Sequence, residues 1–180
     1  MNLALVVMAV ALGTGILQAG SPATPDLQIG DKAPPISLPR LDDGTTIQLP
    51  MISTGAPRAT VLSFFAFWCK PCLQELPHLG RFVEKYRDKG LAVYLVCLDK
   101  NSAETLKAHA KQFGVTLPML LDPDGWKAAF RYRVMDLKEN VSIPQAFVLD
   151  RQGTVRAHYK GFTEEGVKEM EALPVSFTNS

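Results

Sequence analysis

The chain has 180 residues, of which 47% are hydrophobic and 21% are charged. This composition is too apolar for an intrinsically disordered chain, and the length suits one domain whose core needs no disulfide staple. The 19 Lys and Arg residues nearly balance the 18 Asp and Glu residues, so net charge gives no reason to expect a nucleic acid partner.

The first segment is the most apolar part of the chain. Residues 3–17 carry no charge, which is typical of the core of an export signal, and Ala19 offers a small-residue cleavage site. The run is shorter than the roughly 20 residues that span a bilayer comfortably, but it could also stay uncleaved as an anchor. We therefore predict a protein exported to the periplasm or another extracytoplasmic compartment, with a signal peptide or membrane anchor over 1–19, a linker over 20–27, one domain over 28–175 and a tail over 176–180.

The mature part opens with two short extended runs, residues 36–38 and 45–49. Asp42, Asp43 and Gly44 between them predict an acidic hairpin turn. Two nearly continuous apolar runs follow, residues 61–67 and 91–98, which is the pattern of parallel strands covered on both faces.

A strand-helix-strand unit links these two runs. Five apolar residues between them recur at intervals of three and four and predict a helix with one apolar stripe: Leu73, Leu76, Leu79, Phe82 and Tyr86. A strand, helix and strand of these lengths form a βαβ unit.

The second half alternates in the same way. We predict a helix from Ser102 to Gly114, a strand over 117–121, a helix over 126–132 after the turn at 122–125, a hairpin of strands 145–149 and 154–159, and a last helix carrying Val167, Met170 and Leu173.

The chemistry lies at Trp68, Cys69, Lys70, Pro71 and Cys72, where the first buried strand stops and its helix begins. Two cysteines three residues apart on an opening helical turn point the same way and can join as a disulfide. The positive end of the helix dipole favours the thiolate of Cys69, and Lys70 adds a nearby positive charge. We therefore expect Cys69 to attack and Cys72 to resolve.

Two other uses of the cysteine pair are weaker. A zinc site needs a second close pair of ligands, which Cys97 and the three histidines do not supply, so we expect no metal. A purely structural bridge across two residues would restrain the unfolded chain only slightly. We therefore favour the hypothesis that Cys69 and Cys72 carry out dithiol chemistry.

With its surroundings, the motif makes the chain resemble the TlpA/ResA-like branch of thioredoxin-fold proteins, which are exported thiol:disulfide oxidoreductases. The resemblance covers most of residues 28–163. It rests on Gly30, Ala33, Pro34, the run 64–72, Pro77, Ile143, Pro144, the strand to Asp150, Gly153 and Gly161. It implies an α/β thioredoxin fold with a central mixed sheet flanked by helices, an N-terminal β-hairpin and a central αβ insertion.

The resemblance also implies roles for particular residues. Pro144 would take the cis form and pack against the redox pair, while Ile143 presents its backbone to an extended substrate segment. Glu75, one helical turn past Cys72, would shuttle the proton of that thiol. Trp68 would form a wall of the site.

The chain departs from the family pattern at several positions. Ser63 stands where thioredoxins carry a buried aspartate, so Glu75 is the only acid nearby in sequence. Gln145 replaces the threonine common after the cis proline, and residues 135–141 make a longer approach to it.

The remaining cysteine and the histidines look structural. We expect Cys97 to be a small hydrophobe of the core. His109 borders an apolar helix stripe, His158 falls on the wet face of the last hairpin and His78 lies on a helix surface. None of the three has a partner in sequence that would make it catalytic.

These observations predict an enzyme that exchanges dithiol and disulfide with proteins through a mixed disulfide and needs no bound cofactor. The resemblance favours a reducing role, for example on the haem-attachment cysteines of apocytochrome c, with electrons from a membrane partner. One alternative is a peroxiredoxin-like antioxidant protein, although the Thr and Pro pattern of a peroxidatic cysteine is missing. Others are a copper-handling protein that uses Cys69, Cys72 and a distant histidine, and a non-catalytic interaction domain.

Overall fold

The computed structural model describes residues 26–122 and 126–172. The predicted export segment, residues 20–25 of the linker, Leu173 and the tail lie outside the described residues. The elements are β1 (Ile36–Pro39), β2 (Thr46–Leu49), β3 (Ala59–Phe65), α1 (Lys70–Tyr86), η1 (Arg87–Lys89), β4 (Leu91–Cys97), α2 (Ala103–Gln112), β5 (Met119–Leu121), α3 (Lys127–Arg131), β6 (Gln145–Asp150), β7 (Val155–Lys160) and α4 (Glu164–Ala172). Within the described residues no helix has both the length and the apolar character of a membrane span.

The central sheet has five strands in the order β5-β4-β3-β6-β7. Strands β3, β4 and β5 run parallel, while β6 and β7 are antiparallel to their neighbours. All seven residues of β3 are buried, as the continuous apolar run predicts for a central strand. The predicted βαβ unit is β3-α1-β4.

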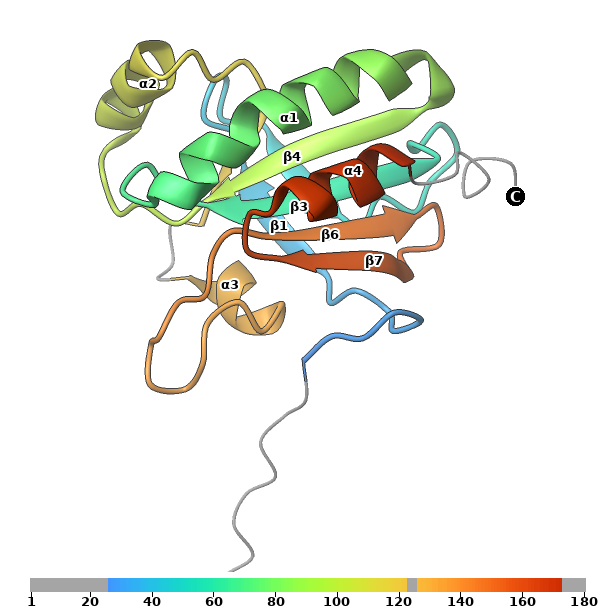
Figure 1. The fold of residues 1–180 in the computed structure, drawn as a ribbon. Helices are drawn as coiled ribbons and strands as arrows, with labels where there is room; N and C mark the ends of the chain where they lie inside the picture. Colours follow the sequence, from blue (N-terminus) through green and yellow to red (C-terminus); the bar gives the residue numbers. More distant parts are fainter. Residues whose placement is uncertain (1–25, 123–125, 173–180) are drawn as a thin grey trace, which may run out of the picture.

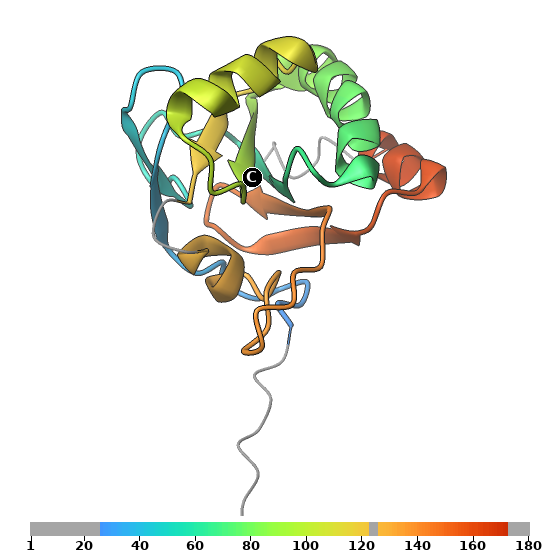
Figure 2. The same cartoon turned by 90° about the vertical axis from the view of Figure 1, so that its left-hand side faces the viewer.

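Helices and the N-terminal hairpin cover the two faces of this sheet. Figures 1 and 2 show α1 and α4 on one face, and the β1-β2 hairpin and α3 on the other. Each face buries its own apolar cluster, with Leu79 and Met170 in the first and Leu49 and Tyr132 in the second. The predicted fold class, a mixed sheet between helices with an N-terminal hairpin and an αβ insertion, is confirmed.

Strand β3 ends at Phe65, two residues before the apolar run stops. The backbone amide of Phe67 donates instead to the side chain of Asp99, at 2.7 Å from Oδ2. The chain therefore leaves the sheet ladder at this point and turns into the redox motif.

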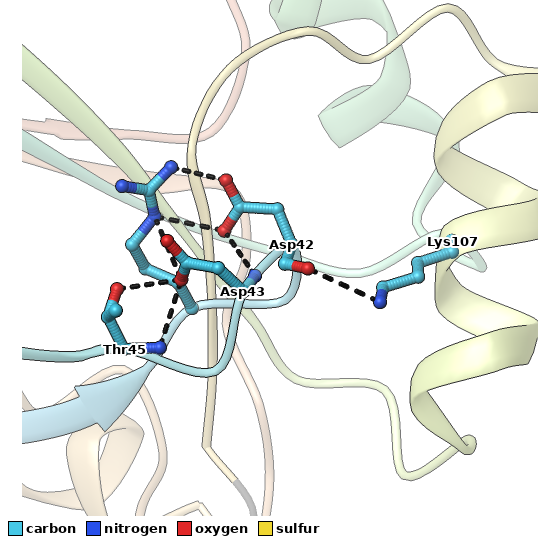
Figure 3. A network of polar contacts seen from close by, with 5 residues as sticks. Asp42, Asp43, Thr45 and Lys107 are labelled. Atoms are coloured by element: carbon cyan, nitrogen blue, oxygen red, sulfur yellow. Dashed lines mark hydrogen bonds and ion pairs between the residues drawn. The ribbon is translucent and has the colours of Figure 1, made fainter.

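The acidic hairpin turn is anchored to α2 (Figure 3). Arg40 forms ion pairs with Asp42 and Asp43, and the Asp43 carboxylate accepts hydrogen bonds from the backbone and hydroxyl of Thr45 at 2.9 and 2.7 Å. Lys107 on α2 reaches the carbonyl of Asp42 at 3.4 Å. These contacts join the hairpin to the αβ insertion.

Candidate active site

Cys69 and Cys72 form a disulfide at the start of α1, with Cα atoms 5.3 Å apart. Cys69 is the N-cap residue, and its Sγ accepts the backbone N–H of Cys72 at 3.2 Å. A helix amide directed at this sulfur stabilises negative charge there once the bond is reduced. Cys69 keeps 6% exposure and Cys72 none, so Cys69 is the more accessible of the two cysteines.

The other residues of the motif face solvent. Lys70 and Pro71 are exposed on the first turn of the helix, where proline is compatible with helix geometry. Trp68 exposes 60% of its surface directly beside Cys69. Its ring is therefore available to a docked protein.

The segment before β6 comes back to the redox pair. The Ile143–Pro144 peptide is cis, as expected, and Pro144 is buried. The carbonyl oxygen of Ile143 lies 3.8 Å from Cys69 Sγ. Two parts of the chain 74 residues apart thus meet at one sulfur, at the end of the sheet where α1 begins (Figure 1).

Glu75 is inside the protein. Its exposure is only 3%, and its Oε2 accepts a hydrogen bond from the Ser63 hydroxyl at 3.1 Å. Burial raises the pKa of this carboxyl to about 7, although the Ser63 hydrogen bond lowers it. Because Cys72 and Glu75 are both buried and three residues apart on α1, they share one helix face. A carboxyl that titrates near neutral pH can take up and release a proton under ordinary conditions.

The hydrogen bond between Ser63 and Glu75 is known only from the structure. The sequence marks Ser63 only as a departure from the family pattern, and the hydrogen bond depends on how α1 lies on β3. Asp99 belongs to no motif in the sequence, and the available signal is its position just after a buried strand.

Cys97 is a buried free thiol, which confirms the expectation for this residue. Burial raises the pKa of its thiol to about 12, and it donates weakly to Asp99 Oδ2 at 3.5 Å. A thiol in this environment stays protonated and unreactive at neutral pH.

The expectation that His158 lies exposed on the polar face of the last hairpin is wrong. It is half-buried, its ring stacks on Phe147 with centroids 4.0 Å apart, and its Nε2 lies 2.7 Å from Gln145 Oε1. His78 is half-buried and contacts Arg81, while His109 packs against Phe67. In the part of the chain that the structure describes, no three His, Cys, Asp or Glu side chains form a metal-binding group.

Comparison with known proteins agrees with this geometry. A family model described as the AhpC/TSA family matches residues 29–158. The chain is 31% identical to the thioredoxin-like protein YneN of Bacillus subtilis over 161 residues, which cover 88% of this chain and 86% of that protein. It is 26% identical to the thiol-disulfide oxidoreductase ResA of Bacillus cereus over 167 residues, which cover 92% and 89%. A solved structure from Chlorobium tepidum, assigned as a thiol:disulfide interchange protein DsbE, superposes with a TM-score of 0.70 at 28% identity, covering 85% of this chain and 99% of that one.

Proposed function

The chain belongs to the AhpC/TSA family and is a thioredoxin-like thiol:disulfide oxidoreductase, and from this premise we propose that it reduces protein disulfides outside the cytoplasm, using Cys69, Cys72 and Glu75. The observation that carries the proposal is the setting of Cys69 Sγ. This sulfur caps α1, accepts the Cys72 amide and lies beside the Ile143 carbonyl.

The reaction proceeds by two exchanges of sulfur bonds. The Cys69 thiolate attacks one sulfur of a substrate disulfide, which forms a Cys69–substrate bond and releases the other substrate sulfur as a thiolate. The Cys72 thiolate then attacks Cys69 Sγ, forms the internal disulfide and releases the second substrate thiolate. Two electrons pass to the substrate, and the two thiolates take up protons.

Glu75 supplies the proton transfer of the second exchange. As a carboxylate it accepts the proton of the Cys72 thiol, which makes that sulfur a nucleophile, and it later returns the proton to solvent or to a leaving thiolate. Its burial on the same face of α1 as Cys72 and its pKa of about 7 support this role.

Substrate proteins bind on the face that carries Trp68, Ile143 and Pro144. Ile143 lies beside the reactive sulfur and Trp68 exposes its ring next to it, so both can contact a bound segment. Lys70 and Pro71 complete the exposed turn of the motif.

The compartment and the electron supply complete the proposal. Residues 1–19 direct export or anchor the protein, and residues 28–175 form the catalytic domain. In an oxidising compartment the internal disulfide must be reduced again, so we propose a membrane protein dithiol as donor. We propose the reducing direction, with the cysteines of apocytochrome c as one substrate class.

Trapping of covalent partners tests the exchange mechanism. The full chain with Cys72→Ser, produced in an exporting bacterial host, should accumulate mixed disulfides through Cys69 that dithiothreitol releases. The double variant Cys69→Ser with Cys72→Ser is the matched control and should trap nothing. Absence of mixed disulfides in the single variant would contradict the proposal.

Two assays with the purified protein test the direction of electron transfer. The reduced protein should reduce insulin disulfides faster than it consumes hydrogen peroxide, and the oxidised protein should oxidise reduced ribonuclease A poorly. Efficient oxidation of ribonuclease A would reverse the proposed direction, and rapid turnover of peroxide would favour the antioxidant alternative.

A further inference from the structure

The residue after the cis proline makes two hydrogen bonds inside the protein. Gln145 is 3% exposed, and its Nε2 donates to the carbonyl of Ser142 at 2.8 Å. Its Oε1 lies 2.7 Å from Nε2 of His158. Because the amide nitrogen is already the donor to Ser142, the amide oxygen accepts and His158 donates.

His158 is itself held in place. It lies opposite Phe147 in the β6-β7 register, and its ring is stacked on that side chain with planes at 18°. Such a cross-strand contact fixes the ring orientation and directs Nε2 at Gln145. The result is a chain of contacts from Phe147 through His158 and Gln145 to Ser142.

This chain of contacts ends next to the reactive sulfur. Ser142 precedes Ile143, whose carbonyl lies 3.8 Å from Cys69 Sγ. Pro144 has no backbone N–H to donate, so its backbone holds this segment only through its carbonyl, which accepts the Gly161 amide at 2.8 Å. The Gln145 side chain supplies a tether on one side, and the Ser142 amide, which donates to the Val134 carbonyl at 2.9 Å, supplies one on the other.

We propose that Gln145, held by His158, is a positioning residue that fixes the Ile143 backbone beside Cys69 and thereby sets the rate at which protein disulfides react. This inference rests on the proposed function. A protein substrate must place its own backbone against Ile143, whereas a small disulfide needs access only to the Cys69 sulfur. Loss of the tether therefore slows protein substrates selectively.

Gln145→Met is the direct test, because methionine has a similar volume and removes both hydrogen bonds. We expect kcat/KM for insulin reduction to fall about threefold to tenfold, the range for loss of the single hydrogen bond that tethers Ser142, while the rate with dithiobis(nitrobenzoic acid) stays at the wild-type value. Gln48→Met, the same change at an exposed position of β2, is the matched control and should alter neither rate.

Two further variants separate positioning from folding. Gln145→Glu keeps an acceptor for His158 but cannot donate to Ser142 as a carboxylate, so it should show the same selective loss. His158→Phe keeps the ring stack and removes the donor, so a smaller loss is expected. Adding His158→Phe to Gln145→Met should cause no further fall, because the two residues act through one contact chain.

The outcomes distinguish this inference from the proposed function. If the wild-type protein reduces neither insulin nor the small disulfide, the proposed function fails. If the wild type reduces both and the Gln145 variants keep the insulin rate, only the positioning role fails. An equal fall with both substrates would indicate general damage to the site and would also overturn the inference.

Discussion

Ionisation of Glu75 lowers the free energy of unfolding by an amount that can be measured. The carboxyl is buried, and its pKa rises from 4.5 to about 7 in the folded protein. The folded state therefore holds this proton more tightly than the unfolded chain. The contribution of this proton to the free energy of unfolding is fully present below pH 4.5 and is lost as the pH rises through 7. At about 1.4 kcal/mol for each pH unit between the two values, the loss amounts to about 3 kcal/mol.

The variant Glu75→Gln isolates this effect, because it keeps the shape and an acceptor for Ser63 but cannot ionise. We expect the free energy of unfolding of the wild type to fall by about 3 kcal/mol relative to the variant between pH 4.5 and pH 8.5. Urea denaturation with the disulfide intact measures the difference at each pH. Glu84→Gln, at an exposed position of the same helix, is the control and should leave the wild-type profile unchanged.

Parallel pH profiles of the wild type and Glu75→Gln would refute the reasoning, since they would mean that burial does not disfavour the charged carboxyl. The same variant also gives a kinetic result. Without a proton acceptor, resolution of the mixed disulfide by Cys72 should slow about 100-fold above pH 7, as measured by quenched-flow detection of the intermediate.

Three other substitutions test the surroundings of the site and the sheet. Ser63→Ala removes a hydrogen bond that favours the charged form of Glu75, so the pH profile of unfolding should move to higher pH. Cys97→Ala should keep the insulin reduction rate, and thiol titration of the reduced wild type should show Cys97 reacting only after denaturation, because burial raises its thiol pKa to about 12. Burial raises the pKa of Asp150, but hydrogen bonds from turn amides and Arg156 outweigh it and leave the pKa below the usual value. Asp150→Asn should therefore cost about 1–2 kcal/mol at pH 7, with a smaller difference at pH 3, as measured by urea denaturation.

Those features that depend on local pattern were predictable from the sequence. The apolar runs located β3 and β4 because central parallel strands are buried on both faces, and the three-four spacing located α1. The cysteine spacing placed both sulfurs on one helical turn, and the observed disulfide agrees with it. In each case the signal lies within a few residues of the element that it predicts.

Contacts between elements could not be predicted in the same way. Alternation along β7 placed His158 on a polar face, but that face is partly covered by the start of the described chain, where Asp26 pairs with Lys160. No local pattern indicates that Gln145 contacts His158, because this contact depends on the register between β6 and β7. Register is a property of the assembled sheet rather than of either strand.

The residues that we propose to act on the two sulfurs lie on opposite faces of the sheet. Ser63 pairs with Ala146 in the register of β3 and β6, and its hydroxyl donates to Glu75 on the face covered by α1. Gln145 comes one residue earlier on β6, so its side chain points to the other face. The proposed proton transfer at Cys72 and the proposed positioning of the backbone beside Cys69 thus depend on different faces of one sheet, so a substitution on either face should alter one exchange step without displacing the other.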